Sequence, residues 1–237
     1  MTNLITAGCY VVRVLEGPHA FGHGMLPQQV LTLSSCLTEL FPSVTAFEWA
    51  SCSEPERIAD AAKFGIRAAS VPELMRTMTD AAAAGKVDGT AVWNSLDDAR
   101  AAAHQFDLDS GSFALLELGV PDDLVPELLI ELQLMPDDLV DSFAAALRTG
   151  APLRDGGVAL GWELLGAELG GEFHSWLCNS LEEDAAKQLG VRPGPFGLLA
   201  TEHEARAVAG LIAAGLGAEP VPWFPGLLIR HPWQARV

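Results

Sequence analysis

The chain has 237 residues, of which 14 are lysine or arginine and 31 are aspartate or glutamate, so its formal net charge is −17. Hydrophobic residues make up 49% of the chain and charged residues 19%, which is too apolar for a disordered protein. The negative charge excludes binding of nucleic acid through its phosphates, which requires clustered lysine and arginine. The sequence contains no apolar run of about 18 residues, so it predicts no membrane-spanning helix.

Segments rich in β-branched and aromatic residues, bounded by glycine or proline, predict strands. In chain order these strands are expected at 9–15, 44–50, 90–93, 112–118, 158–165, 196–200 and 226–230. Amphipathic or capped segments between them predict helices. The helices are expected at 28–40, 73–84, 137–147 and 173–189, with two more beginning at 95 and 201. This alternation predicts an α/β fold in which helices pack on mixed sheets.

Two of the predicted helices resemble each other, which suggests an internal repeat. Residues 95–103 (SLDDARAAA) and 201–209 (TEHEARAVA) both open with a capping-box pattern, and their flanking elements occur in the same order. We interpret this as a tandem duplication of a β-α-β-α unit. An N-terminal α/β lobe is then expected at 1–120 and a C-terminal α/β lobe at 137–237, either as separate lobes or as one pseudo-symmetric domain. Between them, 121–136 forms an acidic connector that begins with the first of two PDDLV sequences.

The four cysteines, Cys9, Cys36, Cys52 and Cys178, form no CxxC pair. Dispersed cysteines in a chain of this length are typical of reduced core residues. Only eight residues precede Cys9, and none of them is lysine or arginine, so no signal peptide is predicted. We therefore expect a cytoplasmic protein.

The first candidate site is the glycine-rich segment 17–25, which follows a predicted strand and contains His19 and His23. Two histidines can ligate a metal or cofactor or relay protons, although an ordinary loop has the same composition. The second candidate is 172–178 (EFHSWLC). On a helix His174 and Cys178 share one face, so the imidazole could polarise the thiol for catalysis, or both could bind a metal, with Glu172 orienting the ring. A purely structural role for this turn is the alternative.

The third candidate is a carboxylate beside a tryptophan, in Glu48-Trp49 and Trp162-Glu163. In a cleft between the lobes, such a glutamate could have a raised pKa and act as an acid or base. Because successive strand residues point to opposite faces, we expect instead that each tryptophan faces inward and each glutamate outward. The segment 219–233 is rich in proline and tryptophan, and its aromatic rings either cover a pocket or fasten the chain end to the core. No GxSxG, HExxH, Walker or EF-hand motif is present, so no cofactor is predicted.

Three functions fit these observations. The leading hypothesis is an acidic, non-enzymatic protein that binds a basic protein partner, as an immunity or antitoxin-like inhibitor does, because the charge of −17 steers such a partner toward it. The alternative is a small-molecule enzyme or ligand-binding protein whose site between the lobes uses His174, Cys178, Glu172 and the loop that carries His19 and His23. The third hypothesis is a scaffold or assembly component held together by apolar patches. None of these hypotheses involves nucleic acid or a membrane.

Overall fold

The computed structural model describes residues 3–16, 27–41, 52–88, 91–133, 142–167, 172–178, 181–215 and 218–234. These residues form a curled antiparallel sheet of six strands in the order β4-β1-β5-β8-β6-β7, together with a small β2-β3 ribbon. The strands are β1 (Leu4–Arg13), β2 (Leu15–Glu16), β3 (Gln29–Val30), β4 (Leu40–Phe41), β5 (Phe113–Pro121), β6 (Val158–Ala167), β7 (Phe173–Ser175) and β8 (Trp223–His231). The predicted mixture of helices and sheet is therefore confirmed.

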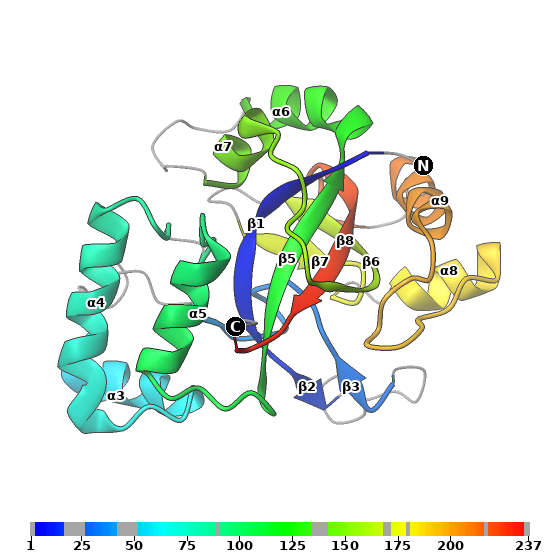
Figure 1. Cartoon of the computed structure of the whole chain (residues 1–237). Coiled ribbons are helices and arrows are strands. Elements are labelled where there is room, and N and C mark those ends of the chain that lie inside the picture. The colour runs from blue at the N-terminus through cyan, green and yellow to red at the C-terminus, as the bar shows by residue number, and fades with distance from the viewer. Residues whose placement is uncertain are drawn as a thin grey trace.

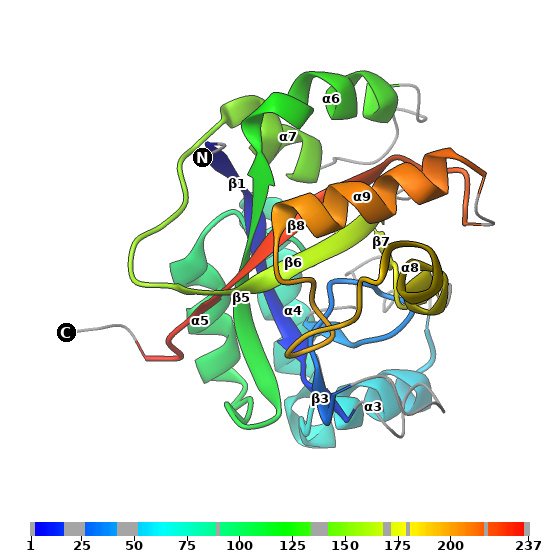
Figure 2. The same cartoon turned by 90° about the vertical axis from the view of Figure 1, so that its right-hand side faces the viewer.

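Seven α-helices surround this sheet within the described ranges (Figure 1). They are α3 (Glu54–Lys63), α4 (Val71–Ala83), α5 (Leu96–Gln105), α6 (Val125–Gln133), α7 (Ser142–Thr149), α8 (Leu181–Leu189) and α9 (Glu202–Ala213). Helices α3–α5 gather on one side of the sheet and α8 and α9 on the other, while α6 and α7 lie across one end (Figures 1 and 2). Every residue of β5 is buried, because both faces of this central strand are covered.

The sheet joins the two halves of the chain directly. Strands β4, β1 and β5 come from the first half and β8, β6 and β7 from the second, and the halves meet where Leu116 of β5 pairs with Arg230 of β8. One sheet thus runs through both predicted lobes, and a duplication into two similar lobes is not shown by this arrangement.

Two bulges interrupt the central strands at glycines. In β1 the register shifts between Thr6 and Cys9, where Gly8 has φ +122°, and a Cβ there would lie 2.5 Å from Val92. In β6 the register shifts between Ala159 and Gly161. Such bulges bend a strand and increase its twist, which suits a sheet that curls.

Three helix predictions are confirmed, at α4, α5 and α9. Ser95 caps α5 by accepting hydrogen bonds from the backbone N–H groups of Asp97 and Asp98, and Thr201 forms the predicted capping box with Glu204 on α9. Within 137–147, the structure describes only the part that forms α7, and the predicted strand at 44–50 lies outside the described residues.

Two helix predictions are wrong in ways that matter for the candidate site. Residues 28–40 form no helix: β3 is followed by an extended segment, a turn at 35–37 and β4. Thr32 and Ser34 bond to nearby polar groups in this segment, and such side chains compete with helical hydrogen bonds. The helix expected at 173–189 begins only at Leu181, because the first residues pair with β6 as β7 and then turn.

Candidate functional site

Two turns from distant parts of the sequence bring three ligating side chains together. Cys36 lies in the turn at 35–37, His174 on β7, and Cys178 in the turn that follows β7. Their ligand atoms all lie within 4.8 Å of one another, and Cys36 Sγ is 3.7 Å from His174 Nδ1. We refer to Cys36, His174 and Cys178 as the thiol–imidazole cluster.

The cluster lies at the protein surface. The Cys36 side chain is exposed, Cys178 is partly buried, and His174 is 9% exposed. The predicted helical spacing of His174 and Cys178 is wrong, yet the two residues do meet. The backbone N–H of Cys178 donates to the carbonyl of Ser175, which closes the turn that returns the thiol to the imidazole.

The thiol of Cys178 is held by two polar groups. The backbone N–H of Ser175 donates to its Sγ at 3.1 Å, and Ser34 Oγ lies 2.9 Å from the same atom. Burial raises the pKa of Cys178 to about 11, since it outweighs these two hydrogen bonds, which favour the thiolate. Cys178 therefore stays protonated at neutral pH unless a cation reaches its sulfur.

A buried carboxyl group lies beneath the cluster. Glu163 on β6 has no solvent exposure; it accepts hydrogen bonds from Thr32 Oγ1 and, at 3.0 Å, from the backbone N–H of Leu33. Ser175 also bonds to this carboxyl, but burial dominates and raises the pKa of Glu163 to about 7. Glu163 thereby ties the segment that carries Cys36 to the segment that carries His174.

The outward orientation predicted for Glu163 is wrong. Trp162 is partly buried against α8 and α9, and Glu163 faces the opposite side of β6, which the segment 31–34 covers. Simple alternation assumes one solvent-exposed face, whereas this strand is covered on both. The other pair, Glu48 and Trp49, lies outside the described residues.

The other predicted site residues do not join the cluster in the described structure. Glu172 accepts a hydrogen bond from Ser35 Oγ at 3.2 Å, which places its carboxylate beside the turn that carries Cys36. His19 and His23 lie outside the described residues. The sequence analysis missed Cys36, assigned there to the core, because 138 positions separate it from His174.

Three ligands of these types fit zinc. Zinc is bound by cysteine sulfur at about 2.3 Å and histidine nitrogen at about 2.0–2.1 Å, so tetrahedral ligand atoms lie about 3.6–3.8 Å apart. The distance of 3.7 Å between Cys36 Sγ and His174 Nδ1 already matches this value. The sulfur of Cys178 lies no more than 4.8 Å from each of these two atoms, so small side-chain rotations bring it to the same separation. The same side chains permit two alternatives to metal binding: an external two-electron oxidant could join Cys36 and Cys178 in a disulfide, or the imidazole could accept the thiol proton of Cys36 and make it a nucleophile. Only a metal ion uses all three groups at once.

Comparison with known proteins gives no further assignment: no family model, curated protein or solved structure matches this chain. Within the described residues, no helix is both long and apolar enough to cross a lipid bilayer.

Proposed function

We propose that this protein binds a zinc ion through Cys36, His174 and Cys178 and acts on a small molecule at the metal. The observation that carries the proposal is the convergence of three ligand atoms within 4.8 Å. Structural zinc sites are closed by four protein ligands, whereas catalytic sites use three and leave one position for water or substrate. Among the described residues the cluster supplies three ligands, as in the second type, and one of them, Cys36, is exposed to solvent.

The residues around the cluster supply the support that a metal site needs. Ser175 N–H and Ser34 Oγ already point toward the sulfur of Cys178, and hydrogen bonds of this kind orient a thiolate ligand. Glu163 acts as a positioning residue, because its bonds to Thr32 and Ser175 hold the two ligand-bearing segments together. Bound zinc would supply Lewis acidity and lower the pKa of a bound water.

The proposal predicts tight, stoichiometric zinc binding that depends on the cluster. Replacing Cys36 or Cys178 with serine, or His174 with asparagine, should weaken zinc affinity by about 100-fold or more, since even residues that only support ligands change affinity by about 10–100-fold. Affinity is measured by competition with a chromogenic chelator under reducing conditions. Cys52→Ser is the matched control, because Cys52 is also partly buried and free but lies outside the cluster.

The double variant Cys36→Ser/Cys178→Ser separates this site from general cation binding. A protein with a net charge of −17 attracts divalent cations through its carboxylates, and the double variant keeps all of them. Equal zinc affinity in the wild type and the double variant would contradict the proposal. So would a Cys36–Cys178 disulfide that persists under reducing conditions and blocks the metal.

A further inference from the structure

A pocket of 480 Å³ lies where β8 ends and β6 begins. The thiol–imidazole cluster lies near the opposite half of β8. Its apolar wall includes Val158, Leu160 and Trp233, and its polar wall includes Arg230 and His231. The volume falls within the range of small-molecule sites, which combine apolar walls with a few placed polar groups. None of these residues belongs to the proposed zinc site.

Arg230 is a cation without an acidic partner. Among the residues that the structure describes, no carboxylate forms an ion pair or hydrogen bond with its guanidinium group. Arg154, which lies beside the same sheet, is by contrast paired with the carboxylate of Glu117. Arg230 therefore offers its donors to the pocket.

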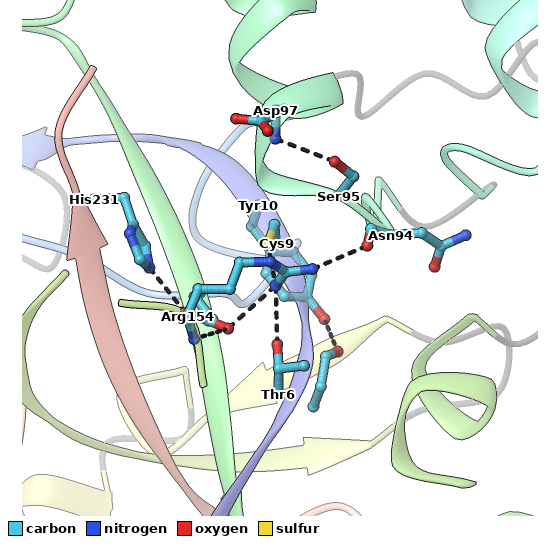
Figure 3. A network of polar contacts seen from close by, with 10 residues as sticks. Thr6, Cys9, Tyr10, Asn94, Ser95, Asp97, Arg154 and His231 are labelled. Carbon is cyan, nitrogen blue, oxygen red and sulfur yellow. Dashed lines mark hydrogen bonds and ion pairs between the residues drawn. The ribbon is translucent and has the colours of Figure 1, made fainter. Parts of the chain in front are cut away.

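His231 is held rigidly at the pocket wall by a buried network. It is 3% exposed, and its Nε2 lies 2.8 Å from Oε2 of the fully buried Glu117. Arg154 Nη1 donates to the other oxygen of Glu117 at 3.1 Å, and also to Thr6 Oγ1 at 3.2 Å. Figure 3 shows Arg154 reaching toward Thr6 and Asn94, to both of which it donates hydrogen bonds. The network fixes the ring, because each of its members has a polar partner.

Gly157 allows the chain to pass close over this ring. A Cβ at Gly157 would lie 2.3 Å from Ile229 and 2.9 Å from His231. Only glycine therefore lets the 156–158 segment approach β8 and form the edge of the pocket. Strands β5, β6 and β8 supply five of the nine lining residues, including Arg230 and His231, and connecting segments supply the others, including Trp233. The strand residues favour a preformed binding site.

We propose that this pocket binds a small organic carboxylate with an apolar body. The guanidinium of Arg230 pairs with the carboxylate, for which its planar fork is suited, and Trp233, Leu160 and Val158 contact the apolar body. A phosphate fits less well, because one arginine leaves most of its oxygens without donors.

Phenylacetate is a suitable probe, with phenylacetamide as its neutral analogue. Isothermal titration calorimetry on the full chain should show saturable binding of phenylacetate and at least about 10-fold weaker binding of the amide, because a charge-assisted pair contributes about 1.5–3 kcal/mol. Arg230→Gln should weaken phenylacetate binding by a similar factor. Arg192→Gln, which removes the same charge from an exposed site, should not.

A second pair of variants tests the pocket without altering the strand core. Val158 and Ile130 are 63% and 62% exposed, so either tolerates aspartate. Val158→Asp places a negative charge at the pocket and should weaken phenylacetate binding about 10-fold, whereas Ile130→Asp on α6 should leave it unchanged. Circular dichroism melting confirms that each variant is folded. Absent binding, equal binding of the amide, equal effects of both aspartates, or preference for inorganic phosphate would each overturn the proposal.

Discussion

Glu117 and Glu163 are both fully buried glutamates of the central sheet, but their surroundings shift their pKa values in opposite directions. Burial alone would raise the pKa of Glu117, yet hydrogen bonds from His231, Thr6 and the Arg154 backbone, together with the Arg154 charge, lower it. Glu163 receives hydrogen bonds only from neutral groups, so burial prevails and its pKa rises to about 7. A nearby cation thus decides which buried carboxylate is ionised.

The two shifts have opposite consequences for stability. The lowered pKa of Glu117 stabilises the fold above the unfolded value of about 4.5, and this contribution is lost as pH falls through the folded pKa. The raised pKa of Glu163 means that the folded state is more stable when this carboxyl group is protonated. Its contribution is fully present below about 4.5 and is lost as pH rises through about 7.

Glutamine substitutions test this contrast. At pH 8 Glu163→Gln should be more stable than the wild type by up to about 3 kcal/mol, and the gain should vanish near pH 4, where Glu163 is protonated anyway. Glu117→Gln should destabilise the fold by about 2–3 kcal/mol at pH 8, because it leaves Arg154 and His231 without their carboxylate. Urea unfolding of the metal-free protein at both pH values measures the difference. A change in stability in the same direction for both variants at pH 8 would contradict the opposite pKa shifts of Glu117 and Glu163.

At the scale of single elements, local signals predicted α5 and α9 correctly because their first turns carry their own capping residues. The helix predicted at 28–40 from the same kind of local signal is wrong. Its leucines have helical spacing, but Thr32 and Leu33 bond to Glu163, which lies 130 positions away. Tertiary hydrogen bonds of this range leave no periodic pattern in the sequence.

The cap of α9 gives a direct test of an element. Thr201→Ala removes the side-chain acceptor for the backbone N–H of Glu204 and should cost about 1 kcal/mol of unfolding free energy. The control is Thr79→Ala in the interior of α4, where Thr79 is exposed and alanine has the better helix propensity. Thermal unfolding should show a lower melting temperature for the first variant only. A loss of equal size in both would mean that the cap contributes nothing specific.

At the candidate site, too, local signals predicted some residues, whereas residues brought in from distant segments were missed. The sequence predicted that His174 and Cys178 act together, although for a helical reason that is wrong, since β7 and a turn replace the helix. It did not predict Cys36 or the inward Glu163, because their proximity depends on how the segment 31–36 crosses β6. Only the pairing of distant segments in the folded chain brings these groups to one place.

At the scale of the whole molecule, the net charge of −17 still predicts a basic protein partner. Because exposed charges are screened over about 8 Å at physiological salt, such a complex should weaken as salt increases. Capture from lysate at low and moderate salt tests this expectation, with the recovered partner identified by mass spectrometry. Recovery of no salt-sensitive basic protein would contradict it. Neither result bears on the zinc site, whose ligands are sulfur and nitrogen.

The curled sheet also explains why the molecule has two separate candidate sites. Strand β8 lies between β5 of the first half and β6 of the second half (Figure 2). The thiol–imidazole cluster lies at the β7 edge, while the pocket at Arg230 lies at the C-terminal end of β8. Each site rests on a different buried glutamate, Glu163 or Glu117. The tandem duplication that the sequence suggested stays a prediction, because one continuous sheet joins both halves.

The most direct test of the central claim is the absorption spectrum of the reduced protein with one equivalent of cobalt(II), which substitutes for zinc and reports its ligands. Two thiolates and one imidazole predict intense visible bands of tetrahedral cobalt and a thiolate charge-transfer band in the near ultraviolet. This charge-transfer band should be about half as strong in Cys36→Ser and unchanged in Cys52→Ser. A weak octahedral spectrum without charge transfer, the same in all three proteins, would contradict metal binding by Cys36, His174 and Cys178.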